Sequence, residues 1–356
     1  MKAKFTLSKS KILEQYKIIE TAADIVSYSS KTNPDATLIL EENVNCLFSV
    51  HMFNELKHIK DKSRVLFLAQ GWNHKLISEL VRQGIFRFAV DNETDLDILL
   101  TYLEIEVVNN VHNADFKIEL MLRVKLKENT LKTERYFVFG MPSETVSKRI
   151  LGLKGHPKIS SLGIHFHRKT QNMAEWNLVY EVSQMFSEEV LSAINIMNIG
   201  GGFPSMYANT NVDVINSVFR KIEELKTYLH ERNIRLMLEP GRFIAAPAGK
   251  LITEIIAIYE NNIIVNASIY NSDMDAVIVP VKLLVRNELS KEVAAEKNAK
   301  PYVVKGSTPC SVDLFRYRVY LDNPKVGDKL VFINAGAYNF ASDFCDLEKL
   351  ETEIIE

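Results

Sequence analysis

The chain has 356 residues, with 43 Lys and Arg against 45 Asp and Glu and a formal net charge of −2. Hydrophobic residues make up 47% of it and charged residues 25%, which is typical of a globular protein and excludes a disordered or collagen-like chain. The near-neutral balance argues against a protein whose main partner is the phosphate backbone of a nucleic acid.

The sequence also favours a cytoplasmic protein with no membrane attachment. We find no apolar run long enough to span a bilayer. The basic N-terminus meets Glu14 and Gln15 where a signal peptide needs an apolar core. The three cysteines are odd in number and widely spaced, so they predict neither a disulfide framework nor a CxxC metal site and fit a reducing compartment.

Eight short apolar segments alternate with longer helical patterns in the first two thirds of the chain. Strand-length segments separated by helices predict βα units and a parallel sheet, and eight of them are the number of a (β/α)8 barrel of the TIM type. The expected strands are 25–30, 46–52, 64–70, 86–91, 117–126, 162–167, 194–199 and 234–238.

The pattern changes after residue 242. Segments rich in Ile, Val and Tyr follow one another, separated by Asn, Asp, Pro and Gly, without helix-length patterns between them. This predicts an antiparallel β domain. We therefore expect an α/β fold with two domains: a barrel with an N-terminal strand and helix in residues 1–242, and a C-terminal β domain in residues 243–356.

The candidate site lies where the barrel strands end, because barrel enzymes carry their active sites at the C-terminal ends of the strands. Lys31 follows the first strand, Gly200–Gly202 the seventh, and Glu239 and Arg242 the eighth. Three glycines before a helix let backbone N–H groups approach a phosphate, and Arg242 lies in the next such loop.

Two histidines, His165 and His167, stand two residues apart on the sixth strand and therefore face the same way. Such a pair suits a metal ion. No Cys, Asp or further His lies beside them in the sequence, so we predict no metal site.

Five motifs in this order resemble the fold-type III pyridoxal 5′-phosphate (PLP) decarboxylases, the group of ornithine and diaminopimelate decarboxylases. The resemblance covers nearly the whole chain. The motifs are YSSKTNP at 28–34, NIGGGFP at 198–204, LEPGRFIAAPAG at 238–249, GSTPCSVDLF at 306–315 and VGDKLVFINAGAY at 326–338.

The resemblance implies a role for each matched residue. Lys31 would carry PLP through a Schiff base, Glu239 would hold the pyridine nitrogen protonated, and His167 would stack on the ring. Cys310, from the partner subunit of a homodimer with shared active sites, would be the catalytic acid. The remaining cofactor contacts would be Arg123, Thr170, Gly200, Gly201, Gly202, Arg242 and Tyr338.

This chain departs from the family where a basic substrate would be held. Ala267 replaces one usual carboxylate, and in an ungapped alignment Pro309 replaces the reactive Cys and Cys310 the distal acid, while Asp313 remains. A buried distal ammonium needs a carboxylate partner. Lys169 stands where the family has Gly, beside Arg168, and Ser49 where many members have Asp.

We therefore expect a substrate other than a free basic amino acid. A larger conjugate with anionic or neutral distal groups, such as an aminocarboxypropyl group on a specialised metabolite, fits better, with Arg168, Lys169 and Asp313 as substrate contacts. Siderophore, aminoglycoside and microcin C-like antibiotic biosynthesis are candidate pathways. Two alternatives stay open: a PLP-dependent racemase or epimerase, and a catalytically inactive decarboxylase-like binding protein.

Overall fold

The computed structural model describes residues 1–109, 116–125, 139–169, 176–210, 212–339 and 341–356. These residues form two compact units. The barrel unit contains Tyr16–Phe203 and Asp213–Gly241, and the β unit contains Met1–Gln15, Pro204–Val212 and Arg242–Glu356.

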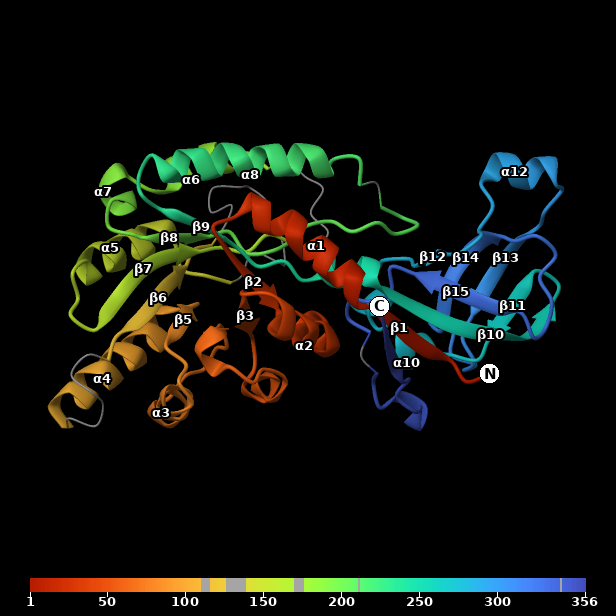
Figure 1. Cartoon of the computed structure of the whole chain (residues 1–356), viewed down its shortest axis with the longest axis horizontal. Coiled ribbons are helices and arrows are strands. Elements are labelled where there is room, and N and C mark those ends of the chain that lie inside the picture. The colour runs from red at the N-terminus through yellow and green to blue at the C-terminus, as the bar shows by residue number, and fades with distance from the viewer. Residues whose placement is uncertain (110–115, 126–138, 170–175, 211, 340) are drawn as a thin grey trace. The chain divides into compact units, whose positions relative to one another are not determined.

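The barrel unit is built on a closed barrel of eight parallel strands (Figure 1). Each expected strand is present, and the first pairs with the last to close the barrel. The strands are β2 (Ile25–Ser29), β3 (Leu47–Val50), β4 (Val65–Phe67), β5 (Arg87–Val90), β6 (Ile118–Arg123), β7 (Ile159–His165), β8 (Ile196–Asn198) and β9 (Arg235–Leu238). The (β/α)8 prediction is confirmed.

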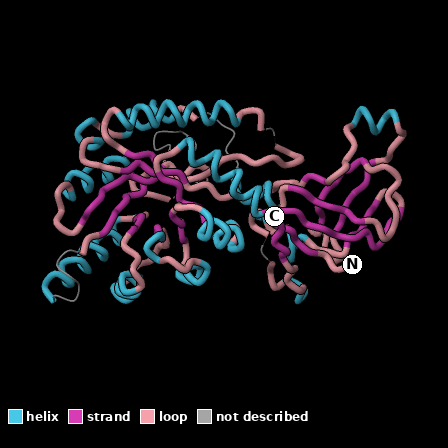
Figure 2. The backbone as a smooth tube through the Cα atoms, viewed as in Figure 1, coloured by secondary structure: helices cyan, strands magenta, loops and turns pink. Residues whose placement is uncertain are grey.

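Helices alternate with these strands along the chain (Figure 2). They are α1 (Lys9–Ala22), α2 (Pro34–Asn43), α3 (His74–Arg82), α4 (Glu93–Asn109), α5 (Ser143–Leu153), α6 (Leu178–Met185), α7 (Glu188–Leu191) and α8 (Ile215–His230). α6 and α7 are separate helices, because Phe186 is extended and Ser187 caps a new helix by accepting from the Val190 N–H. Residues 53–58 form a 3-10 helix.

A hydrophobic layer inside the barrel sets the place of the polar site. Leu66, Ala89, Met121, Ile196 and Met237 pack together there. Alternate residues of a strand share one face, so the residues two positions further along face the same interior, closer to the C-terminal ends of the strands. On four strands those residues are polar: Asp91, Arg123, Asn198 and Glu239.

The β unit contains eight strands. They are β1 (Lys4–Ser8), β10 (Gly249–Tyr259), β11 (Asn262–Val265), β12 (Leu284–Val285), β13 (Pro301–Lys305), β14 (Leu314–Tyr320), β15 (Lys329–Ile333) and β16 (Thr352–Ile355). The order β12-β15-β10-β11-β13-β14 forms the sheet, and β1 pairs with β10 and β16. Because β11–β13 and β1–β16 are parallel pairs, the sheet is mixed rather than purely antiparallel.

Short helices lie among the strands of this unit. They are α9 (Arg242–Ala245), α10 (Ile269–Ser272), α11 (Asp275–Ile278) and α12 (Lys291–Glu296). Phe315 and Phe332 stack in the core of the unit, with ring centroids 4.7 Å apart. The N-terminal strand belongs to this unit because Phe5 pairs with Leu251 of β10, whereas the sequence-based division placed it with the barrel.

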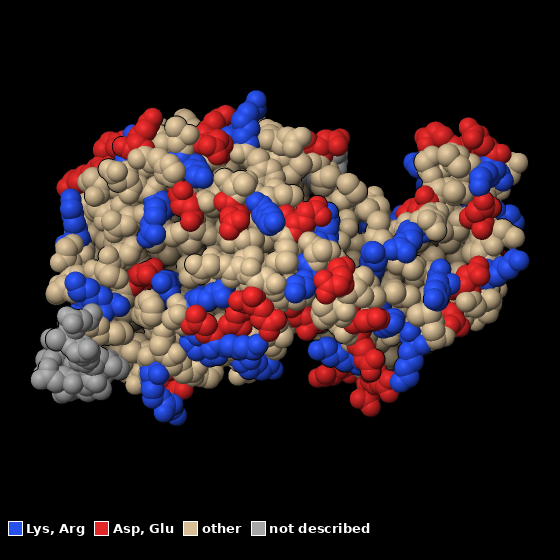
Figure 3. All heavy atoms as spheres, viewed as in Figure 1, with Lys and Arg blue, Asp and Glu red and all other residues tan. Residues whose placement is uncertain are grey.

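The surface charge and the hydrophobicity of the helices agree with the composition of the chain. On the face drawn in Figure 3, acidic and basic side chains are interspersed. None of the helices in the described part of the chain has both the length and the hydrophobicity that crossing a bilayer requires.

Candidate active site

Lys31 lies in a sharply turned loop at the end of β2. Ser30–Thr32 form a 3-10 turn, and Asn33 then caps α2 by accepting from the Asp35 and Ala36 N–H groups at 2.9 and 3.2 Å. The pKa of Lys31 is lowered, because desolvation outweighs the attraction of Glu55 and Glu239. The side chain remains exposed to solvent, so a lysine with a depressed pKa stands where a ligand can reach it.

Glu239 is the most heavily hydrogen-bonded acid of the site. Its Oε1 accepts from Ser49 Oγ at 2.9 Å and from Asn198 Nδ2 at 3.0 Å, and its Oε2 lies 3.4 Å from His165 Nε2. Although burial alone raises the pKa of this 2% exposed carboxyl, the neighbouring histidines, His165 above all, bring it below its usual range. Glu239 therefore stays ionised at neutral pH.

His167 is positioned by the glycine loop. The Gly201 N–H donates to His167 Nδ1 at 3.2 Å, so the neutral ring carries its proton on Nε2. A Cβ at Gly201 would lie 2.5 Å from the Glu239 carbonyl oxygen, and one at Gly200, where φ is +69°, would lie 2.6 Å from His167 Nδ1. Only glycine fits this approach of the backbone to the histidine.

The pKa of His167 is also lowered. Desolvation is the main cause, and it outweighs the attraction of Glu239, while the nearby His165, Arg123 and Lys31 act in the same direction as desolvation. One third of the side chain is exposed. The ring is therefore neutral at pH 7 and open to a ligand.

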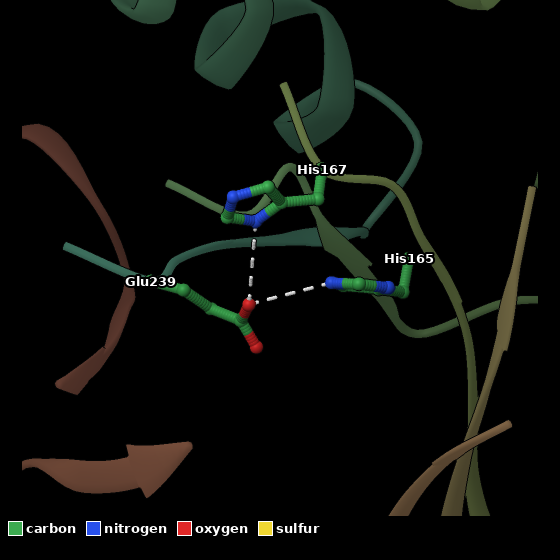
Figure 4. A group of neighbouring side chains, drawn as sticks. All are labelled: His165, His167 and Glu239. Carbon is green, nitrogen blue, oxygen red and sulfur yellow. Dashed lines mark hydrogen bonds and ion pairs between the residues drawn. The ribbon is translucent and has the colours of Figure 1, made fainter. Parts of the chain in front are cut away.

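The fold brings a third polar residue, Glu239, close to His165 and His167. His165, His167 and Glu239 each offer a donor atom, and these atoms lie within 4.8 Å of one another (Figure 4). The local sequence does not reveal this because Glu239, which follows β9, is 72 or more residues away. The lone pair of His167 Nδ1 already accepts from Gly201, and Glu239 Oε2 faces both rings.

Sequence reasoning assigned no role to four side chains of this cluster. Ser49, Asn198 and His165 surround Glu239, and the two-residue spacing after Ile196 could have identified Asn198. Glu55 is the fourth. Its Oε1 accepts from the His51 N–H at 3.1 Å, and its pKa is raised by burial, which the attraction of Lys31 opposes.

Both predicted cofactor arginines are paired within their own units. Arg123 at the end of β6 contacts Asp91 at 3.0 Å. Arg242 is buried, donates to Tyr207 Oη at 2.9 Å and forms a two-pronged pair with Asp275. Its guanidinium lies 4.9 Å from the centroid of the Tyr338 ring, so these two predicted phosphate ligands are neighbours.

The predicted substrate contacts have different surroundings. Arg168 is buried, donates to Glu181 at 2.5 Å and lies over the Trp176 ring, so an internal ion pair accounts for its charge. Lys169 is exposed, and Thr170 falls outside the described residues.

Asp313 anchors the loop between β13 and β14. Its Oδ1 accepts from the Ile269 N–H at 2.9 Å, and its Oδ2 accepts from the N–H and Oγ1 of Thr308 at 3.0 and 2.6 Å. A Cβ at Gly306 would lie 2.0 Å from Oδ1, so the carboxylate packs directly on the loop backbone. Asp313 thus holds the loop that carries Cys310.

Cys310 has a hydroxyl partner that the sequence did not suggest. Its Sγ lies 3.0 Å from Tyr270 Oη. This hydrogen bond is the main cause of a lowered pKa of the Cys310 thiol, and it raises the pKa of Tyr270 to about 12. The thiol is therefore closer to its reactive, ionised form than an ordinary surface cysteine.

Tyr270→Phe removes the donor and is expected to raise the pKa of the Cys310 thiol. Alkylation by iodoacetamide at neutral pH should then slow about threefold at Cys310, since the thiolate is the nucleophile. Peptide mass spectrometry across a pH series measures the rate. Exposed Cys345 is the internal control, and buried Cys46, whose thiol pKa burial raises to about 11, should stay unmodified. An unchanged Cys310 profile contradicts this coupling.

Comparison with known proteins gives the family. Residues 9–246 match the family model described as "Pyridoxal-dependent decarboxylase, pyridoxal binding domain". The chain is 22% identical to the diaminopimelate decarboxylase of Helicobacter pylori, covering 97% of this chain and 87% of that protein.

Two further proteins are similar to the chain, one in sequence and one in structure. The 2-[(L-alanin-3-ylcarbamoyl)methyl]-2-hydroxybutanedioate decarboxylase of Staphylococcus aureus is 26% identical, covering 79% of this chain and 74% of that protein. The lysine/ornithine decarboxylase of Vibrio vulnificus, solved with cadaverine, superimposes with a TM-score of 0.79 at 21% identity, covering 99% of this chain and 94% of that one.

The site fits the cofactor of that family. An ionised Glu239, a neutral and partly exposed His167 and a lysine of lowered pKa are the groups that a pyridinium ring and its aldehyde need. The glycines at 200–202 bring backbone close to His167, and backbone without side chains can also approach a phosphate closely. The chain therefore belongs to the PLP-dependent decarboxylases, as a divergent member whose cofactor is PLP.

Proposed function

We propose that this enzyme removes the α-carboxylate, as CO2, from an L-amino-acid moiety whose distal end is not an ammonium group. The occupied carboxylate of Asp313 carries this proposal, because each of its oxygens already accepts from Ile269 or Thr308. A buried ammonium without an acceptor is unfavourable by several kcal/mol, roughly. The substrate then belongs to specialised metabolism, and the S. aureus relative is named for a substrate with a hydroxybutanedioate group.

Residues of the barrel unit and of the β unit would each have a role. Lys31 would hold the cofactor covalently, Glu239 would face its pyridine nitrogen, and His167 would contact its ring. Bound PLP would supply the electron sink that lets CO2 leave from Cα. Gly200–Gly202, Arg242, Tyr338, Arg123 and, outside the described residues, Thr170 are the proposed remaining contacts.

Cys310 is the proposed acid that returns a proton after CO2 has left. Its lowered thiol pKa keeps the proton mobile near neutral pH, and the hydrogen bond to Tyr270 stabilises the thiolate that remains. We infer that the enzyme works in the cytoplasm as a homodimer in which this loop completes the partner's site.

The function is tested by trapping and by gas release. Borohydride reduction of the purified enzyme followed by peptide mapping should place the pyridoxyl group on Lys31. A panel of amino acids and amino-acid conjugates should then release CO2 from non-basic members faster than from ornithine or lysine. Label on another lysine, or efficient turnover of ornithine, contradicts the proposal.

Dimerisation is tested by mixing variants. Lys31→Ala and Cys310→Ala should each be nearly inactive alone, yet recover about a quarter of the activity when mixed, because random subunit exchange creates dimers with one intact shared site. Mixed variants that stay inactive while they exchange subunits would rule out a shared site.

Racemisation is the second candidate. A racemase needs a second acid-base group besides the cofactor lysine, and Tyr270, beside Cys310, is the residue that could provide it. Loss of optical activity without release of CO2 would decide for it.

A further inference from the structure

The β unit carries a pocket of about 570 Å³ around the loop of Cys310. This volume is in the range of small-molecule sites. The lining comes from the β13–β14 turn and from the neighbouring ends of β10 and β11, and it includes Cys310, Lys305, Tyr259 and Tyr317. A molecule that reacts beside Cys310 would therefore extend its far end into this pocket.

The two charged residues that line the pocket differ in how accessible their charges are to a ligand. Lys305 and Asp313 are the charged residues among those that line it. Asp313 is 3% exposed, and its oxygens accept from Ile269 and Thr308 as described above. Its negative charge is therefore directed into the loop, and the charge that a ligand meets is the positive one of Lys305.

Tyr259 positions Lys305 so that its ammonium group can bind an anion. Its Nζ donates to Tyr259 Oη at 2.9 Å and lies 5.2 Å from the centroid of the same ring. An ammonium has three N–H donors, so the bond to Tyr259 fixes its place and leaves donors for a ligand. Hydroxyl groups of Ser307, Ser311 and Tyr317 line the same pocket.

We propose that this pocket binds a carboxylate at the distal end of the substrate and that Lys305 determines this specificity. The inference rests on the proposed function for the placement of the reacting carbon near Cys310. A carboxylate would gain a charge-assisted hydrogen bond from Lys305. An ammonium would meet a like charge and an occupied Asp313.

Three amino acids of matched length test the charge directly: L-2-aminoadipate, L-norleucine and L-lysine, which end in a carboxylate, a methyl group and an ammonium. Isothermal titration of the full-length holoenzyme should give a Kd for L-2-aminoadipate about tenfold below that for L-lysine, with L-norleucine between them. Equal or tighter binding of L-lysine, or binding of none of the three, overturns the proposal.

Variants of Lys305 test whether this residue causes the preference for a distal carboxylate. Lys305→Met should reduce the preference to less than about threefold, Lys305→Arg should retain it, and Lys305→Glu should reverse it in favour of L-lysine. Lys300→Met, outside the pocket lining, should behave as wild type. Thermal unfolding checks that each variant is folded, and a full preference in folded Lys305→Met contradicts the assignment.

The experiments distinguish a failure of the proposed function from a failure of the pocket assignment. If Lys31 carries no pyridoxyl group but the carboxylate preference depends on Lys305, the proposed function is wrong and the pocket stands. If Lys31 is labelled and CO2 is released without any preference, the pocket assignment alone is wrong.

Discussion

Lys31→Ala should abolish covalent cofactor binding and lower the rate of CO2 release about 10³-fold or more, a loss of about 4 kcal/mol in transition-state stabilisation. The physical reason is the loss of an amine whose pKa desolvation has lowered, at the end of a strand that fixes its position. Visible absorbance of the bound cofactor and the rate of CO2 release are the measurements.

A matched lysine controls for unspecific effects. Lys60 lies on the surface of the same unit, where it contacts Glu42, and such exposed pairs contribute about 0 to 1 kcal/mol to stability. Lys60→Ala should keep the absorbance and the activity. A Lys31→Ala protein that still traps the cofactor on another residue would show that the site is misassigned.

Glu239→Gln should lower the rate about 10²- to 10³-fold, or about 3 to 4 kcal/mol, while the protein stays folded. The amide keeps the shape of the side chain but loses the negative charge, and with it the partner of a protonated pyridine nitrogen. Ser49 and Asn198 donate to Oε1 and keep the charge in place. Ser49→Ala should therefore produce a smaller loss, about tenfold, through one missing hydrogen bond to a charged group.

The readout that separates catalysis from structure is the spectrum. The absorbance of the bound cofactor should change with pH differently in Glu239→Gln than in wild type, whereas a purely structural role would alter the unfolding temperature alone. Wild-type activity and spectrum in Glu239→Gln would refute the assignment.

The barrel could be predicted from sequence because its strands are buried on both faces and read as continuous apolar segments between helices. Lys31, the glycines and Glu239 could be named because each follows such a segment directly. The strand β12, with two residues, and the break after Val265 could not, since local composition there is as apolar as in a longer strand.

The hydrogen-bond partners of the site residues could not be predicted from the sequence for a different reason. Ser49 and Glu239 are 190 residues apart, and Tyr270 and Cys310 are 40 apart. Hydrogen bonds of this kind depend on how strands and loops are placed around the barrel or sheet, which no local pattern records. The hydrogen bonds from backbone N–H groups to Asp313 are likewise visible only in three dimensions.

The contact between Gly201 and His167 has a consequence for acid tolerance. Desolvation is the main reason that the native His167 ring resists a proton that the unfolded chain accepts, and protonating Nδ1 would also cost the hydrogen bond from Gly201. As the pH falls below the ordinary histidine range of about 6.5, the unfolded state takes up more protons than the native state and the free energy of unfolding decreases. Glu239, whose pKa is also lowered, adds to this loss below about pH 4.3. The geometry that keeps the ring neutral therefore makes the folded barrel less stable in acid.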